Sequence, residues 1–350
     1  MSDTTINLTT AADADISELI HSVLTDARES AGPADPTGAP TDLDRGLWAT
    51  LTETGLAALT AAEDQGGSEA SWLEAAVLVS ATAATAARVP VVEHDLLALW
   101  LLAQAGLPAD DGIRTVAVLD AEGRADNVAW AGQTDRIVLA WPSGDGYAVA
   151  DLPTAEVAIA PTASLGNRPT ARINVDPAAI TGTPVGAEVI AAFEQRAALA
   201  RALQICGALE QILQVTITHV TERVQFGRPL AKFQAVQNLV TDIATEAALA
   251  RSATDAALLA AVNSDWESAD LHFAIAAARS CCGHAATVVV RNAHQALGAI
   301  GTTKEHQLHE FTQPVLMWRS EYGTTAEFDE HLTTCAIGAG GSGIWDLLTR

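Results

Sequence analysis

The chain has 350 residues, of which 49% are hydrophobic and only 18% are charged, and its formal net charge is −24. A chain this long and this apolar can bury a large core, which excludes an intrinsically disordered protein. The acidic balance argues against nucleic acid and anionic membrane surfaces as partners. An anionic ligand would therefore need a local basic site.

Cysteine usage and the N-terminus favour a reduced, cytoplasmic protein. The four cysteines contain no Cys-x-x-Cys pair, and we interpret all four as reduced core residues. They are Cys206, Cys281, Cys282 and Cys335. Met1–Thr10 lacks the basic and apolar regions of a signal peptide. The run Leu97–Leu107 is too short to span a membrane, so we expect no membrane-spanning segment.

Residues 1–112 carry four segments with apolar residues at helical spacing, which predicts an N-terminal helical domain. The segments are Ile16–Leu24, Asp42–Leu51, Trp72–Arg88 and Val91–Ala105. The loop Gly32–Pro40 and the pair Gly66-Gly67 separate the earlier ones.

Residues 113–185 change to short β-like runs divided by Gly, Asp and Pro turns. The runs are Thr115–Leu119, Arg136–Trp141, Tyr147–Leu152, Val157–Ala160 and Ala171–Val175. This pattern predicts a small β-domain inserted in a mostly α-helical protein.

Residues 186–350 return to long helical segments with short breaks, which predicts a four-helix bundle with a terminal hairpin. The segments are Glu188–Glu222, Phe233–Val262, Trp266–Leu297, Lys304–Ser320 and Thr324–Cys335. We interpret the Gly-rich tail Gly338–Gly343 as a flexible linker.

The connection Glu222–Gln237 concentrates polar residues in a chain that is short of cations. Pro229 cannot continue a helix, so the break between two helices falls there. Arginine's planar fork suits phosphate. Spacing alone leaves two interpretations: a helix corner whose polar groups cap both helices, or a site for an anion. The polar residues are Arg223, Gln225, Arg228, Lys232 and Gln234.

Two segments, Glu222–Gln234 and His294–Glu305, together resemble the acyl-CoA dehydrogenase family. The family pattern combines Arg-x-x-Phe-Gly, a Gln eight residues after the Phe, and a Gln-x-x-Gly-Gly-x-Gly segment further on. The matching residues here are Arg223, Phe226, Gly227, Gln234, Gln295, Gly298 and Gly301. Leu47–Leu56 and Asp64–Ser68 also look like the family's N-terminal helices. The resemblance implies the acyl-CoA dehydrogenase fold, with domains at 1–112, 113–185 and 186–350.

The resemblance also implies FAD bound between two subunits, with these segments holding the pyrophosphate and adenosine end of the neighbouring subunit's cofactor. Arginine supplies a bidentate donor for pyrophosphate, and glutamine amides donate and accept. Ala299 stands where the family usually has Gly. The implied cofactor residues are Arg223, Gln225, Phe226, Gln234, Gln295, Gly298 and Ala299. The histidines lack a metal-like pairing, so we expect no metal.

Two family features are missing. The β-domain lacks the Thr-Glu-Pro-x-x-Gly-Ser-Asp and Trp-Ile-Thr/Ser segments that hold the flavin ring and the thioester. The usual position of the catalytic glutamate falls on Tyr322, and a phenol is a poor base at neutral pH. The family's alternative position falls on Ala197. Glu321 is a candidate for a displaced base if the alignment slips by one residue.

These features lead us to expect one subunit of a heteromeric acyl-CoA dehydrogenase, resembling the α2β2 enzymes of bacterial steroid degradation. The partner, a related subunit, would hold the flavin ring and the base. The expected substrate is an acyl-CoA thioester, with a steroid side-chain CoA as the first choice. Two alternatives stay open: a self-sufficient homo-oligomer that uses Glu321, and a structural or regulatory subunit that binds no flavin.

Overall fold

The computed structural model describes residues 12–30, 42–165 and 168–349. Met1–Thr10 and the predicted loop Gly32–Pro40 lie outside the described residues. The contacts divide the chain into two compact units. The first unit holds residues 1–82 and 87–197, and the second holds residues 83–86 and 198–350.

The helices of the first unit begin close to where the sequence predicts them. They are α2 (Ala14–Ser30), α3 (Arg45–Glu53) and α4 (Trp72–Ala84), with the short 3-10 turn η1 (Glu63–Gln65). Asp44 caps α3, because its side chain accepts a hydrogen bond from the backbone N–H of Leu47. The helix predicted to reach Arg88 ends earlier, since Ala86 takes a φ of 53° that an α-helix cannot include.

The second predicted helix of this region, Val91–Ala105, is not a single α-helix. It starts as a π-helical segment, η2 (Val92–Leu99), and continues as α5 (Trp100–Gln104). All eight residues of η2 are buried, including three consecutive ionisable side chains, Glu93, His94 and Asp95. Periodicity does not distinguish π- from α-helix over so short a run.

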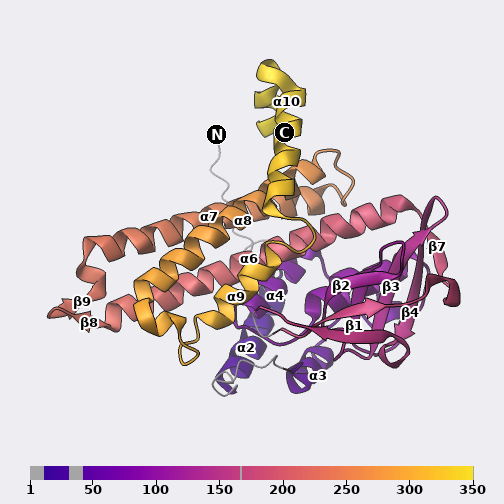
Figure 1. Ribbon diagram of the computed structural model, residues 1–350, viewed down its shortest axis with the longest axis horizontal. Helices are drawn as coiled ribbons and strands as arrows, with labels where there is room; N and C mark the ends of the chain where they lie inside the picture. The colour runs from indigo at the N-terminus through magenta and orange to yellow at the C-terminus, as the bar shows by residue number, and fades with distance from the viewer. Residues whose placement is uncertain (1–11, 31–41, 166–167, 350) are drawn as a thin grey trace. The chain divides into compact units, whose positions relative to one another are not determined.

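Seven strands of the first unit form two sheets (Figure 1). The larger sheet has the order β1-β3-β4-β7 and the smaller has the order β2-β6-β5. Strand β1 pairs in parallel with β3, whereas the other neighbours are antiparallel. The strands are β1 (Arg114–Val118), β2 (Arg124–Ala129), β3 (Arg136–Ser143), β4 (Gly146–Pro153), β5 (Ala158–Thr162), β6 (Thr170–Asn174) and β7 (Thr183–Val185).

The sheets share one hydrophobic core. Ile137, Leu139 and Trp141 occupy alternate positions of β3 and belong to this core together with residues of both sheets, such as Ala150 and Ile173. Strands β2 and β7 were not predicted. Strand β2 alternates poorly because it is interrupted by a register shift, and β7 has only three residues.

The second unit is a helical bundle. Its helices are α6 (Ala187–Glu222, which starts in the first unit), α7 (Gln234–Asn263), α8 (Leu271–Leu297), α9 (His309–Trp318) and α10 (Thr325–Thr349). Helices α7 and α8 pack side by side, and α9 and α10 also contact α8 (Figure 1). Alanines fill much of the inward face of α8, which permits close packing. The predicted class, mostly α with a small β insert, is confirmed.

Two boundaries and the tail of the bundle differ from the predictions. Helix α8 begins at Leu271 rather than Trp266, because Asp265 and Trp266 both take positive φ values. Helix α9 begins at His309 rather than at the predicted Lys304, because the residues between them form turns. The Gly-rich tail is helical within α10 and bends at Gly340, with φ 64° and ψ 175°, so the linker prediction is wrong.

The cysteine and membrane predictions need correction. All four cysteines are free thiols, but only Cys206 and Cys282 are buried, whereas Cys281 and Cys335 are half-buried. By length and apolar composition alone, Leu271–Thr302 could cross a membrane, so the sequence does contain such a run. Its most apolar window is 56% buried, as expected of a core helix in a bundle.

Candidate functional site

The predicted cofactor corner is a β-hairpin between α6 and α7. Strand β8 (Val224–Gln225) pairs with β9 (Arg228–Pro229). The two turn residues, Phe226 and Gly227, have φ values of 52° and 78°, as in the primed turns that match the twist of a hairpin. A bulky residue rarely adopts this conformation, so the turn holds Phe226 at an energetic cost.

An aromatic stack fixes the hairpin to the start of α7. The Arg228 guanidinium lies 4.2 Å from the ring centroid of Phe233, and the rings of Phe226 and Phe233 meet edge to face at 6.2 Å. Phe226 is nevertheless 90% exposed, and Val224 beside it is 56% exposed. An apolar tip held out into solvent is typical of a binding surface.

Arg223 follows α6 directly, and its side chain is exposed. Its backbone N–H donates to the carbonyl of His219, and its own carbonyl accepts from Leu230. Within the described ranges its guanidinium has no hydrogen-bond or ion-pair partner. All the donors of this fork are therefore available to a ligand from outside the chain.

The polar residues of the corner do not cap α7. Phe233 stands at the N-cap and makes no side-chain cap hydrogen bond. Gln234 donates instead to the side chain of Asn238, at 3.1 Å. The first-turn N–H groups of a 30-residue helix are left without a side-chain acceptor, which favours an anion over a capping role for this corner.

The second predicted segment forms the end of α8. Gly298 has φ 65° and ψ −141°, a conformation open essentially only to glycine. An added Cβ would meet nothing within 4 Å. Glycine is therefore required at position 298 by its backbone angles and not by a lack of space. Gln295 and Ala299 are both exposed on either side of it, and Ala299 lies in the 3-10 segment η6 (Gly298–Thr302).

These two segments lie at the same end of the bundle. His219, one helical turn before Arg223, meets His306 edge to face, with ring centroids 5.9 Å apart. His306 belongs to the segment that follows η6. The structure therefore brings the C-terminal ends of α6 and α8 together, although no hydrogen bond among the described residues joins Arg223 to Gln295.

The predicted base position holds a largely buried ion pair. Glu321 accepts a hydrogen bond from Nε of Arg201 at 2.7 Å. The Arg201 side chain is 1% exposed and that of Glu321 is 21% exposed. Nη1 of Arg201 donates to Gln204 at 2.6 Å, and the guanidinium lies 5.4 Å from the ring of Tyr322. One carboxylate oxygen of Glu321 is thus committed to a cation.

A second buried arginine holds the turn that carries Glu321 and Tyr322. Nη2 of Arg279 donates to the carbonyls of Trp318, Glu321 and Gly323, at 3.0, 2.8 and 3.0 Å. These carbonyls follow the C-terminus of α9, where a cation is electrostatically favoured. Burial lowers the pKa of Arg279 to about 10, so it remains charged at neutral pH. Tyr322 itself takes a φ of 54°.

The connection from β1 to β2 is a tight turn. Oδ1 of Asp120 accepts from the backbone N–H groups of Glu122 and Arg124, at 3.0 and 2.8 Å. Gly123 has a φ of 78°, and a Cβ there would lie 2.0 Å from the carbonyl oxygen of Val175. The turn between β1 and β2 packs against the backbone at Val175, so it is not an extended loop that could reach a ligand.

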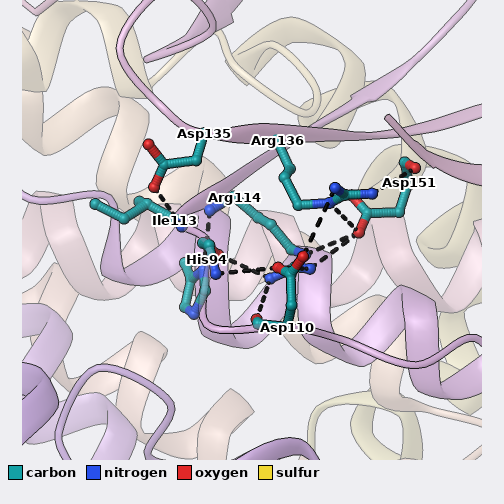
Figure 2. Close-up of polar contacts among 8 residues, drawn as sticks. His94, Asp110, Ile113, Arg114, Asp135, Arg136 and Asp151 are labelled. Atoms are coloured by element: carbon teal, nitrogen blue, oxygen red, sulfur yellow. Dashed lines mark hydrogen bonds and ion pairs between the residues drawn. The ribbon is translucent and has the colours of Figure 1, made fainter. Parts of the chain in front are cut away.

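The first unit contains a separate buried polar cluster, shown in Figure 2. Nδ1 of His94 accepts from the backbone N–H of Arg114 at 3.0 Å. Oδ2 of Asp151 accepts from Nε of Arg114 and Nε of Arg136, at 3.2 and 2.7 Å, and Arg114 also pairs with Asp110. Burial, and secondarily Arg114, lower the pKa of His94 to about 3. The cluster joins η2 to strands β1, β3 and β4, and we interpret it as structural.

Sequence reasoning missed Arg201 and Arg279. Their only sequence signal is that each is a charged residue on a buried, alanine-rich stretch of helix, which requires a partner. The partners are remote in sequence, so their identity could not be inferred. Among the residues that the structure describes, no group of three or more His, Cys, Asp or Glu side chains is arranged to hold a metal ion.

Residues 185–326 match the family model described as "Acyl-CoA dehydrogenase, C-terminal domain". The acyl-CoA dehydrogenase FadE34 of Mycobacterium tuberculosis is 28% identical over 307 residues, which cover 81% of this chain and 42% of FadE34. The chain therefore spans less than half the length of that relative. The acyl-CoA dehydrogenase IpdE2 of the same organism is 28% identical over 279 residues, covering 76% of this chain and 79% of IpdE2.

Solved structures share the fold along nearly the whole chain. The ChsE4-ChsE5 complex from Mycobacterium tuberculosis has a TM-score of 0.78 at 20% identity, covering 95% of this chain and 98% of that chain. A Tcur3481-Tcur3483 steroid ACAD variant has a TM-score of 0.77 at 20% identity, covering 94% and 98%. The predicted acyl-CoA dehydrogenase fold is confirmed. The match of residues 185–326 and the two relatives at 28% identity make the chain similar to acyl-CoA dehydrogenases in sequence as well as in fold.

Proposed function

We propose that the chain is a subunit of an FAD-dependent acyl-CoA dehydrogenase, which oxidises the Cα–Cβ bond of an acyl-CoA thioester. In this proposal the chain completes the FAD site of a related partner subunit. One contrast carries it: the donors of Arg223 are open to solvent, whereas the position of the base is occupied by the Arg201–Glu321 pair.

The residues at the end of the bundle fit the pyrophosphate and adenosine end of FAD. Arg223 would pair with the pyrophosphate, and the N–H groups of Gln234 and Ala235, which have no acceptor among the described residues, would add donors. Gln225, Gln234 and Gln295 would hydrogen-bond the adenosine end, with Phe226 as an apolar contact. Gly298 and Ala299 would let the backbone come close.

Charge supports placing the anion site in this half of the chain. Residues 1–197 hold 28 of the 43 acidic residues and only 9 of the 19 basic ones. The remaining residues hold 15 acidic and 10 basic side chains, among them Arg223, Arg228 and Lys232 at the corner. A pyrophosphate would meet less repulsion there.

FAD, when bound, supplies the acceptor for the substrate hydride. This chain's own residues hold the anionic end of the cofactor and shield it from water. They provide no base: Tyr322 is a phenol, and Glu321 serves Arg201 as its counter-ion. The base and the contacts to the flavin ring would come from the partner subunit.

The comparisons support a heteromer and a steroid-related substrate. One similar structure is a complex of ChsE4 with ChsE5, and another is called a steroid ACAD. In FadE34, more than half of the protein lies outside the matched part. We therefore propose an α2β2 heterotetramer that acts on a steroid side-chain CoA in the cytoplasm.

Purification with and without the partner tests this proposal. The chain expressed alone is expected to be colourless and without dehydrogenase activity. Co-expression with the related subunit encoded beside it should yield a yellow, active complex. A yellow and active homo-oligomer of this chain alone would contradict the heteromer and favour the self-sufficient alternative. An active complex from which this chain's variants remove no flavin would favour a structural or regulatory subunit.

A further inference from the structure

Histidines gather around the end of the bundle that carries Arg223 and Gln295. Four of the nine histidines of the chain lie there: His219, His294, His306 and His309. His294 precedes Gln295 and lies 3.3 Å from the hydroxyl of Thr312. His219 lies in the last turn of α6, and its carbonyl accepts a hydrogen bond from the backbone N–H of Arg223. The proposed cofactor role uses none of these imidazoles.

The hydrogen bonds fix which nitrogens carry protons. Nδ1 of His306 accepts from the backbone N–H of Leu308 at 3.1 Å, so the neutral ring carries its proton on Nε2. Nδ1 of His309 donates to the carbonyl of His306 at 2.8 Å. The rings of His219 and His306 meet at 88° and are both partly exposed. Nε2–H of His306 is therefore a donor beyond those used inside the fold.

The surroundings oppose protonation of this pair while no anion is bound. Burial, followed by Arg223, lowers the pKa of His219, and only Glu222 acts in the opposite direction. Burial, followed by His219 and His309, lowers the pKa of His306. Lys304 and Glu305 flank His306 in sequence with opposite charges. Burial and mutual repulsion among cations thus oppose protonation of the pair.

We propose that His219 and His306 extend the anion-binding surface beside Arg223, and that they take up protons when a phosphate group binds there. A phosphate near Arg223 neutralises the repulsion and gives each imidazolium a partner. Proton uptake and anion binding then strengthen each other. The inference rests on the proposed function, because it assigns these residues to the pyrophosphate of the same FAD.

The coupling is tested by removing bound FAD from the co-expressed complex and titrating the complex with FAD again. Binding is measured calorimetrically at about pH 6 and about pH 7.5, in buffers of different ionisation enthalpy, so that proton uptake is counted directly. The wild-type complex should bind FAD about three- to tenfold more tightly at the lower pH, with net proton uptake. His219→Gln and His306→Gln should each reduce the number of protons taken up and the gain in FAD affinity at the lower pH. His284→Gln is the control, because that ring pairs with Asp329 on α10.

A second measurement needs no flavin. In the chain alone, the titrations of His219 and His306 are followed by NMR with sulfate or with chloride at equal ionic strength, because neither ion titrates near neutral pH. Sulfate should raise the titration midpoints of both rings. Equal midpoints in the two salts would contradict the inference.

The two proposals fail in different ways. If wild type binds FAD without proton uptake, or the histidine variants behave as wild type, the histidine inference is wrong and the half-site stands. If Arg223→Ala in the complex binds FAD as tightly as wild type, the half-site itself is wrong. If only the control His284→Gln lost the pH dependence, the coupling would lie elsewhere in the bundle.

Discussion

Glu321 distinguishes the heteromeric account from a self-sufficient enzyme. In the structure it serves as the counter-ion of buried Arg201. Glu321→Gln should therefore leave kcat of the complex within about twofold, because no proton passes through this carboxylate. It should lower the free energy of unfolding by about 1–3 kcal/mol, reduced from the cost of a fully buried pair by the partial exposure of Glu321.

The control for this variant is Glu330→Gln on the exposed surface of α10, which should change neither quantity. Activity is measured by dye reduction, and stability by denaturant unfolding of the chain. A loss of kcat of a hundredfold or more, with FAD retained, would identify Glu321 as the base and contradict our account.

His94 and Asp95 make opposite contributions to the pH dependence of stability. Folding lowers the pKa of His94 from 6.5 to about 3. Its contribution to the free energy of unfolding is therefore present above pH 6.5 and is lost as the pH falls below that value. Burial raises the pKa of Asp95 from 3.8 to about 7, against the hydrogen bonds from Thr60 and Ala61. Its contribution is present at low pH and is lost as pH rises towards 7. Between pH 5 and 7 the two largely cancel.

Single variants should expose each contribution. The free energy of unfolding of His94→Gln should fall by about 2 kcal/mol between pH 5 and pH 7, a fall that wild type does not show. The reason is that only the contribution of Asp95 remains in this variant. Asp95→Asn should gain about as much over the same range. Urea unfolding at three pH values measures both. If the free energy of unfolding changed in the same direction with pH in both variants, His94 and Asp95 would not titrate in this way.

At the residue scale, motif spacing predicts an anion site at Arg223 but gives no sign of the ion pair that holds Glu321. Arg223 and Gln295 could be found because each belongs to a short local pattern. Arg201 and Glu321 are separated by 120 residues and meet only after the bundle has packed. A single sequence holds no local signal for such a pair.

At the scale of elements, the end of α8 depends on the backbone of Gly298. A residue with a side chain would be strained by about 1–3 kcal/mol at the φ and ψ of Gly298. Gly298→Ala should destabilise the chain by about that amount and reduce FAD retention by the complex. Gly338→Ala, in helical backbone with open space around it, should instead be neutral or slightly stabilising. Thermal unfolding of both variants gives the comparison, and equal melting temperatures would contradict it.

The hairpin tip predicts a change in assembly without a change in fold. Phe226 is 90% exposed and meets Phe233 edge to face, so Phe226→Ser should lower the free energy of unfolding of the isolated chain by about 1 kcal/mol at most. In the complex it should weaken FAD retention or subunit association, because the ring loses an apolar partner from another chain. Leu165→Ser, at a residue 52% exposed in the first unit, is the control and should change neither. Size-exclusion chromatography with absorbance at the flavin band detects both effects.

Element types were predictable from apolar periodicity, but the boundaries followed backbone conformations that periodicity does not encode. Positive φ at Asp265 and Trp266 delays α8. The tail was predicted as a linker because glycine is a poor helix former, yet it is helical up to and beyond Gly340. Strand β2 was missed because its register shift breaks the alternation of side chains.

At the scale of the whole molecule, the chain has the acyl-CoA dehydrogenase fold, with Arg223 exposed and Glu321 paired with buried Arg201. The domain limits 1–112, 113–185 and 186–350 stay a prediction, since the contacts group residues 1–82 and 87–197 into one unit. The order of helices, β insert and helices could be predicted from the sequence. The identity of the proposed partner could not, because one sequence contains no pattern from another chain.

The most direct test of the central claim is the FAD content of the purified complex when only this chain is altered. Wild type should contain one FAD for each copy of this chain. Arg223→Ala with Gln295→Ala should reduce that content at least tenfold while the two subunits still co-purify. Arg291→Ala removes an exposed arginine whose side chain, among the described residues, donates to neighbouring Asn292, and this variant should retain full flavin content. Full flavin content in the double variant would contradict the account.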